Sequence, residues 1–293
     1  MCGIVGYVGN KGAKSFLIDG LSKLEYRGYD SAGIAVLDGT SISLAKQKGR
    51  LSNLEGALKS KSSEGTIGIG HTRWATHGEP SDRNSHPHKS SKGDIAVVHN
   101  GIIENYLELR KWLISEGYEF FSETDTEVVP NLIHYYYEGN LFEAVVKATK
   151  KLEGSYALGV VCGDEQDKLI AVRKDSPLIV GLGNGENFIA SDIPAVIKYT
   201  RDVYLLDDNE FVVMDRNGVS ILSANGERID KNIYKVTWSE DAAEKGGYDS
   251  FMLKEIHEQP AVMRRIIQEY QDEKGNLKID SEIINDVADA DRI

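Results

Sequence analysis

Short apolar runs rich in valine and isoleucine recur along the chain, and residues that favour turns bound each of them. The dipeptides Asp38-Gly39, Asn217-Gly218 and Asn225-Gly226 separate neighbouring runs and suit tight hairpins. The pattern therefore predicts a sheet-rich protein with several hairpins. The expected strands are residues 4–8, 32–37, 66–69, 95–99, 156–162, 169–172, 188–190, 211–214 and 219–222.

Apolar residues recur at helical spacing in fewer places. These segments lie before residue 153, whereas strands dominate after it, so the order is not the strict alternation of a parallel doubly wound fold. We therefore predict a layered α+β architecture in which each helix covers one face of a sheet. The expected helices include residues 16–24, 106–113, 128–136 and 142–152.

The composition changes after Trp238 to a polar stretch that ends in a glycine pair, which is typical of a linker. A new helix is expected near Phe251, with Pro260 as the first position of a second helix. The chain stops at Ile293 without a capping element, which predicts a truncated second domain. The expected parts are a main domain (2–238), a linker (239–250) and the start of a second domain (251–293).

Charge and composition exclude several classes of partner. The 293 residues carry a formal net charge of −12 and no long run of lysine or arginine, which argues against nucleic acid and anionic membranes as partners. No stretch approaches the roughly 18 consecutive apolar residues of a spanning helix, and the start lacks signal-peptide architecture. We therefore expect a cytoplasmic protein that acts on a small soluble substrate.

The two cysteines are too few for a disulfide framework or a zinc ribbon. Cys162 lies in an apolar run and is expected to be a small core residue. Cys2 follows Met1 directly, and once Met1 is removed it carries a thiol and a free α-amine on one residue. The amine, with a reference pKa of about 7.7–8.0, can accept the thiol proton. A buried cysteine in a first strand is the structural alternative.

A polar cluster at residues 71–80 follows a predicted strand and leads into a loop. Arg73 could bind a substrate carboxylate through two hydrogen bonds, and Thr76 and His77 offer further donors. Surface ion pairing and packing are the alternatives for Arg73 and Trp74.

Asn100 and Gly101 close another predicted strand. A side-chain amide beside a glycine N–H can form an oxyanion hole, although Asn-Gly also forms turns. Residues 123–127 resemble a helix start with Thr124 or Asp125 as its cap, but Asp125 could instead face a substrate ammonium. Position alone leaves both alternatives open.

Five of the seven histidines fall between His71 and His99. A zinc site needs three or four convergent ligands, and the His86-Pro87-His88 triplet alone is weak evidence for one. We therefore expect neither a metal nor a cofactor. The glycine-rich segment 181–185 precedes another strand, so we expect a hairpin there and not a nucleotide loop.

Together these segments resemble the class II, N-terminal-nucleophile glutamine amidotransferases. Within that family they are most similar to the branch that aminates fructose 6-phosphate in hexosamine synthesis. The match runs from Cys2 to about Trp238 and resumes over residues 251–260. The sequence motifs that resemble this branch of the family are residues 26–33, 71–78 and 99–105. The resemblance implies an αββα sandwich of two antiparallel sheets.

The same resemblance implies roles at the reacting amide. Cys2 would attack the side-chain amide of L-glutamine, with its own amine as acid and base. Asn100 and Gly101 would stabilise the oxyanion, and Arg27 would support the site.

Recognition of the rest of the substrate is implied in the same way. Arg73, with Thr76 and His77, would hold the α-carboxylate of glutamine, and Asp125 would hold its ammonium. Trp74 would belong to a mobile loop that gates the passage of ammonia. The full-length enzyme would use fructose 6-phosphate and form a homodimer. The alternatives are another ammonia acceptor, such as phosphoribosyl pyrophosphate, and a silent glutamine-binding module.

Overall fold

The structure is a computed structural model that describes residues 2–59, 65–75, 77–238, 247–248, 251–272, 275–276, 278–280, 283, 285 and 287–288. The chain divides into two compact units, Met1–Trp238 and Ser239–Ile293. Among the described residues, no helix has the length and apolar character needed to cross a membrane.

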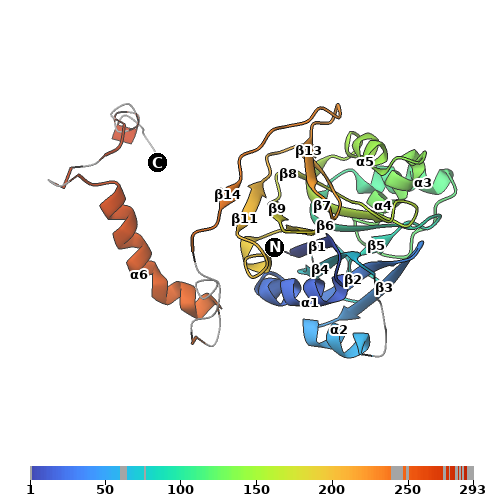
Figure 1. The fold of residues 1–293 in the computed structure, drawn as a ribbon, viewed down its shortest axis with the longest axis horizontal. Coiled ribbons are helices and arrows are strands. Elements are labelled where there is room, and N and C mark those ends of the chain that lie inside the picture. Colours follow the sequence, from blue (N-terminus) through green and yellow to red (C-terminus); the bar gives the residue numbers. More distant parts are fainter. Residues whose placement is uncertain are drawn as a thin grey trace. The chain divides into compact units, whose positions relative to one another are not determined.

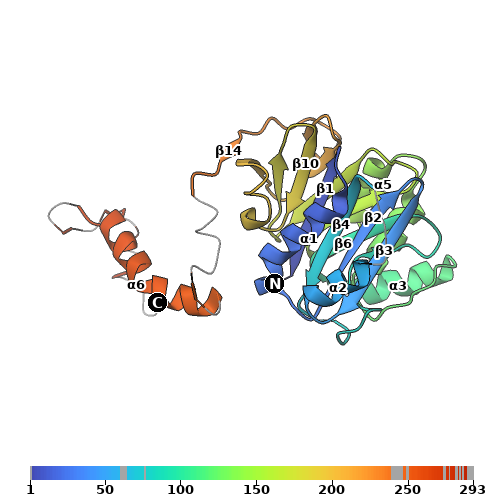
Figure 2. The ribbon, with the colours of Figure 1, turned by 60° about the horizontal axis from the view of Figure 1, so that its bottom comes forward.

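The first unit is built on two sheets in which neighbouring strands pair antiparallel. In the eight-stranded sheet the order is β14 (Tyr234–Lys235), β11 (Asp202–Leu205), β9 (Ile179–Leu182), β10 (Glu186–Ala190), β1 (Gly3–Gly9), β4 (Ile67–Arg73), β2 (Ser31–Asp38) and β3 (Ser41–Lys48). The six-stranded sheet has the order β13 (Val219–Leu222), β12 (Phe211–Met214), β8 (Leu169–Lys174), β7 (Gly154–Cys162), β6 (Ile95–Ile103) and β5 (His88–Lys89). Figure 2 shows β1, β4, β2 and β3 side by side.

Helices cover the outer face of each sheet, and Figure 1 shows the two groups on different sides of the unit. Buried residues of α1 (Ala13–Leu24) and α2 (Leu51–Leu58) pack with those of the eight-stranded sheet. Those of α3 (Tyr106–Ser115), α4 (Val128–Tyr136) and α5 (Leu141–Thr149) pack with the six-stranded sheet. Short 3-10 turns occupy Glu25–Arg27 and Ile193–Ala195. The predicted αββα sandwich of antiparallel sheets is confirmed.

A third core fills the space between the sheets, and the period-two geometry of strands explains how one strand serves two cores. In β1, Val5 and Tyr7 belong to the helix-covered core, whereas Ile4 and Val8 belong to the interlayer core. Strand β6 alternates in the same way. Because both faces are buried, these strands read as continuous apolar runs in the sequence, which is why they are predictable from it.

All nine expected strands and all four expected helices are present; residues 128–136, 211–214 and 219–222 have the expected bounds, and the other elements have shifted ends. Gly183 to Gly185 join β9 to β10 in the expected hairpin. Cys162 is 1% exposed in the core of the six-stranded sheet, as expected. The sequence interpretation missed β3, β5, β9, β11, β14 and α2.

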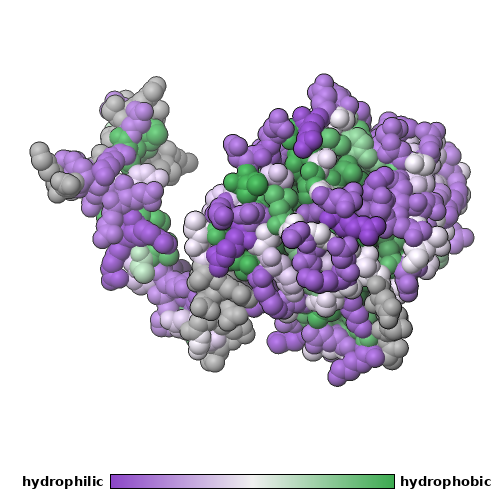
Figure 3. Space-filling view, in the orientation of Figure 1, coloured by the Kyte–Doolittle hydropathy of each residue, from purple (hydrophilic) through white to green (hydrophobic). Residues whose placement is uncertain are grey.

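The second unit contains α6 (Phe251–Glu269), which continues through Pro260. The predicted start of a second helix at Pro260 is therefore wrong. Strong helix formers on both sides of the proline outweigh the hydrogen bond that it removes. Met252, Ile256, Met263 and Ile267 of this helix are exposed, and hydrophobic groups show among its hydrophilic surface in Figure 3.

Candidate active site

A pocket of about 330 Å³ gathers most of the side chains that the sequence marks as candidates. Cys2 stands directly before β1, and the register that pairs Gly3 with Thr72 sets it beside the end of β4. Strand β6 of the other sheet brings its own candidates to the same place. Of the predicted residues, those that line this pocket are Cys2, Arg27, Arg73, Trp74, Asn100, Gly101 and Asp125.

The thiol of Cys2 is held by the backbone of Trp74. The Trp74 N–H donates to Sγ at 3.1 Å, and the Trp74 carbonyl oxygen lies 3.5 Å from the same sulfur. Burial raises the pKa of the Cys2 thiol, and the backbone hydrogen bond from Trp74 opposes that rise. The thiol is thus protonated near neutrality and needs a base before it can act as a nucleophile.

Asn100 and Gly101 lie within β6 and not in a turn, so the turn alternative is wrong. Asn100 Nδ2 donates to the carbonyl oxygen of Cys2 at 3.0 Å, which leaves its second hydrogen for the pocket. Gly101 has φ of 127°, and a Cβ there would lie 2.0 Å from the carbonyl oxygen of Ser155. Only glycine fits this strand end.

Opposite charges face the same pocket. Arg73 and Asp125 are only 4% and 5% exposed. The Nη2 of Arg73 donates to the carbonyl oxygens of His77 and Gly78, whereas its buried Nη1 has no hydrogen-bond partner among the described residues. One Asp125 oxygen accepts the N–H of Ile103 at 2.8 Å. The pair suits a small zwitterion with a carboxylate and an ammonium.

The alternative that Thr124 or Asp125 caps a helix is wrong. Helix α4 begins at Val128, and its N-terminal flanking residue, Glu127, makes no side-chain cap. Thr124 Oγ1 instead hydrogen-bonds His88 Nε2 at 3.1 Å, while Asp125 turns toward the pocket. The segment is a structured turn before the helix, and that turn aims the carboxylate.

Comparison with known proteins agrees with this chemistry: residues 71–198 match the family described as "Glutamine amidotransferase domain". The chain belongs to the glutamine amidotransferases. It is 67% identical to glutamine–fructose-6-phosphate aminotransferase of Clostridium tetani over 90% of this chain and 43% of that protein. The Clostridium perfringens enzyme is 61% identical over 98% and 48%. The predicted resemblance is thereby confirmed.

The chain spans about half the length of the curated relatives it matches. Among solved structures, the glutamine phosphoribosylpyrophosphate amidotransferase of B. subtilis aligns with a TM-score of 0.65 and 26% identity. That alignment covers 79% of this chain and 50% of the other. The common fold therefore extends to a glutamine amidotransferase that is named for phosphoribosylpyrophosphate.

Residues 26–33 contact the chain around Arg73, and Arg27 of this segment lines the candidate pocket itself. A Cβ on Gly28 would lie 2.7 Å from the backbone of Arg73, so this glycine allows the two segments to touch. Asp30 accepts the N–H of Ala75 at 2.8 Å and donates its own N–H to the Arg73 carbonyl at 3.0 Å. Arg27, 8% exposed, donates to Asp192 at 3.1 Å. The sequence interpretation gave Asp30 no role, although Asp30 lies within residues 26–33, one of the segments that carry the resemblance to the family.

A cluster of buried histidines lies beside the pocket. The rings of His71 and His86 stack with centroids 4.1 Å apart, and His99 Nδ1 lies 2.8 Å from Thr126 Oγ1. Burial lowers the pKa of His71 to about 3 and also lowers the pKa of His86, His88 and His99. These imidazoles are therefore neutral at pH 7. The described residues hold no cluster of His, Cys, Asp or Glu arranged for a metal.

The two remaining predicted residues are Thr76 and His77. Thr76 lies outside the described residues. The carbonyl of His77 accepts from Arg73, while its ring packs edge-on against Tyr106 with centroids 5.6 Å apart. The lining also includes residues that the sequence interpretation did not assign: His86, His99, Ile102, Thr124, Thr126, Ser155, Ser176 and Pro177. No local sequence motif marks Ser176 and Pro177, because only the folding of the chain brings them to the pocket.

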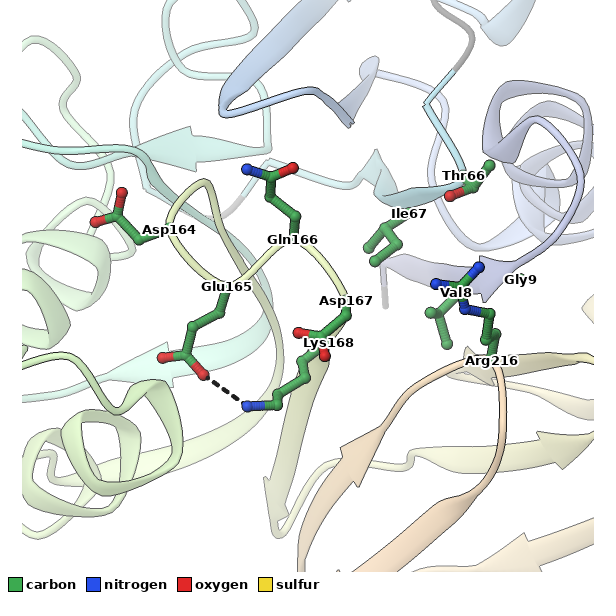
Figure 4. Close-up of a pocket in the computed structure, with 10 residues that line it drawn as sticks. All are labelled: Val8, Gly9, Thr66, Ile67, Asp164, Glu165, Gln166, Asp167, Lys168 and Arg216. Atoms are coloured by element: carbon green, nitrogen blue, oxygen red, sulfur yellow. Dashed lines mark hydrogen bonds and ion pairs between the residues drawn. The ribbon is translucent and has the colours of Figure 1, made fainter.

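A larger cavity of about 530 Å³ lies elsewhere, between the ends of β1 and β4 and the loop before β8. Figure 4 shows its polar lining, in which Glu165 and Lys168 pair with each other at 3.2 Å. Its lining contains no cysteine. Of these two cavities, the smaller one is the one that Cys2 lines.

Proposed function

We propose that this chain hydrolyses L-glutamine to L-glutamate and ammonia, with Cys2 as the nucleophile after removal of Met1. The observation that carries the proposal is the pocket shared by Cys2, the Asn100-Gly101 pair and the Arg73 and Asp125 charges. A thiol, oxyanion donors and two opposite charges are what cleavage of an amino-acid amide requires.

The reaction proceeds through a thioester. The free α-amine of Cys2 takes the thiol proton, and Sγ forms a bond to the amide carbon of glutamine. Asn100 Nδ2–H and Gly101 N–H stabilise the resulting oxyanion. The C–N bond then breaks, and the ammonium of Cys2 returns the proton to the leaving ammonia. Water, deprotonated by the same amine, cleaves the thioester and releases glutamate.

Recognition uses the two ends of the substrate. Arg73 Nη1 binds the α-carboxylate, with Thr76 and His77 as further donors, and Asp125 binds the ammonium. Trp74, which is 47% exposed, lines the pocket and belongs to the loop that gates the passage of ammonia. Arg27, which lines the pocket and donates to Asp192, supports the site.

We propose further that the ammonia serves fructose 6-phosphate in a longer protein. Relatives at 67% and 61% identity carry that name and are about twice as long. Phosphoribosyl pyrophosphate as the acceptor is less well supported, because the solved structure named for it is only 26% identical. The full-length enzyme would be a homodimer in the cytoplasm, a reducing compartment that suits a reactive thiol.

A matched pair of cysteine variants tests the nucleophile. Cys2→Ala should abolish glutaminase activity without unfolding the protein, because the amine then has no thiol to activate. Cys162→Ala, at a buried position far from the pocket, should retain activity. A coupled assay for glutamate, run with and without fructose 6-phosphate, measures the glutaminase activity of both variants. The intact mass of the protein establishes whether Met1 is present. Equal loss in both variants at equal stability would refute the assignment.

A further inference from the structure

One buried hydrogen bond joins the two sheets directly at the pocket. His71 lies on β4 of the eight-stranded sheet and is fully buried. Its Nε2 is 3.0 Å from the carbonyl oxygen of His99 and 3.0 Å from Oδ1 of Asn100, both on β6 of the six-stranded sheet. Strand β4 also pairs with β1, where His71 lies opposite Ile4, so the imidazole comes from the neighbour of the nucleophile's strand.

The two partners determine the protonation state of the His71 ring. A main-chain carbonyl oxygen and an amide oxygen are both acceptors, so Nε2 must carry the proton. Burial keeps the ring neutral, and Nδ1 is then the unprotonated nitrogen. The N–H of Nε2 therefore points at Asn100 Oδ1 at every pH near neutrality.

The ring plane is fixed as well. His86 stacks on His71 with an interplanar angle of 13°. His86 Nδ1 in turn accepts the N–H of His99 at 3.3 Å. The imidazole donor is therefore held by packing and by its hydrogen bonds, and it does not turn away from Asn100.

We infer that His71 is a positioning residue for the oxyanion donor Asn100. A side-chain amide has two orientations that differ in which end faces the pocket. With Oδ1 held by His71 Nε2–H, Nδ2 is forced toward Cys2, where it donates to the Cys2 carbonyl oxygen. In the flipped amide an oxygen would face the developing oxyanion and repel it. The inference rests on the proposed function, in which Asn100 stabilises that charge.

The test compares two substitutions at position 71 in the same chain. His71→Phe keeps a ring against His86 but removes the donor, whereas His71→Gln retains an N–H on a side chain of similar reach. We expect His71→Phe to lower kcat by about 10- to 100-fold with little change in KM. This loss of kcat should be smaller than the loss caused by removing the donor itself in Asn100→Ala. His71→Gln should restore most of kcat.

A double variant separates positioning from general damage. If His71 acts through Asn100, His71→Phe should cost nothing further once Asn100→Ala is present. His134→Phe is the matched control, because it also removes an imidazole hydrogen bond, to Tyr118, outside the pocket and without touching Asn100. It should lower the melting temperature but leave kcat unchanged. Independent losses that multiply in the double variant would overturn the inference.

Two further readouts keep this inference distinct from the proposed function. The dependence of kcat on pH should be the same in His71→Gln and in the wild type. If His71 acted as a base, one limb of that pH profile would be absent in His71→Gln. The side-chain NH₂ of Asn100, observed by NMR, should exchange slowly in the wild type and His71→Gln and faster in His71→Phe. Inactive wild-type protein would refute the proposed function alone, and unchanged Asn100 exchange in His71→Phe would refute the positioning.

Discussion

At the scale of single residues, the charged groups and the amide of the pocket act at different stages of the proposed reaction. Asp125 would bind an ammonium whose charge does not change, so its loss weakens ground state and transition state alike. Asp125→Asn should therefore raise KM for glutamine by about 10- to 1,000-fold with kcat nearly unchanged. Asn100→Ala should lower kcat by about 100- to 1,000-fold instead. Steady-state kinetics on both variants measures the contrast.

Glu138→Gln provides the control, since Glu138 forms an exposed ion pair with Lys147 outside the pocket. It should change neither constant. The opposite result, a kcat effect at Asp125 and a KM effect at Asn100, would mean that the substrate-holding and oxyanion roles are exchanged.

The sequence indicates which residue types could do the chemistry but not what they touch. Cys2, Arg73, Asn100 and Asp125 are recognisable because each lies in a motif, and all four line one pocket. The contact between His71 and Asn100 was not foreseen, because it joins strands of different sheets. A helix cap and an inward-facing aspartate have the same local pattern, so only the fold distinguishes them at Asp125.

At the scale of elements, the end of β6 has a backbone that only glycine adopts. Gly101→Ala would place a Cβ 2.0 Å from the Ser155 carbonyl oxygen at φ of 127°. Strain of this kind costs about 1–3 kcal/mol, and its relief would move the Gly101 N–H that we propose as an oxyanion donor. We expect the variant to melt at a lower temperature and to lose most of its kcat, which calorimetry and the glutaminase assay measure.

Gly218→Ala is the corresponding control, at the glycine between β12 and β13. A Cβ there meets no atom within 4 Å, and its φ is not in the left-handed region. Its stability and kcat should stay at wild-type values. Full activity in Gly101→Ala would show that the backbone at this strand end takes no part in the reaction.

Central elements were predictable and peripheral ones were not. Strands such as β1 and β6 are buried on both faces, so their apolar runs are unmistakable. Strand β3 lies at a sheet edge and exposes Ser41 and Lys48, which breaks the apolar run. Helix α2 is eight residues long, too short for its periodicity to show. Local propensity also misplaced the helix boundary at Pro260.

At the scale of the whole molecule, the buried histidines tie stability to pH. The pKa of His71 is about 3 in the folded protein and about 6.5 when unfolded, so between these values the unfolded state binds more protons. Its contribution to stability is complete above about pH 6.5 and is lost as the pH falls toward 3. The free energy of unfolding should drop by up to about 1.4 kcal/mol per pH unit for this group. Urea titrations between about pH 7.5 and 5 measure that slope.

His71→Gln isolates the contribution of one imidazole, because it keeps the donor and removes the titration. Its pH slope should be shallower than that of the wild type by up to about 1.4 kcal/mol per unit. An unchanged slope would mean that His71 is solvated and titrates near its ordinary pKa in the folded protein.

Topology is the part that local patterns could not supply. Strand β1 pairs with β10, so that Val5 lies opposite Ala190, nearly the whole unit away along the chain. Periodicity describes which face of a strand is buried but carries no information on its distant neighbour. The two-sheet arrangement was predictable only from the resemblance of several motifs to a known family, and the observed sandwich agrees with it.

The sandwich has a mechanical consequence for the rate of reaction. Cys2 leads into one sheet and Asn100 belongs to the other, so the interlayer core acts as a spacer between the thiol and the proposed oxyanion donor. Packed sheets lie roughly 10 Å apart, and cores respond to the volume of a single methylene. Ala96 and Ala157 are small members of that spacer. A bulkier residue at either position would widen the gap, so the filling of the core would adjust the proposed catalytic alignment without altering any group proposed to meet glutamine.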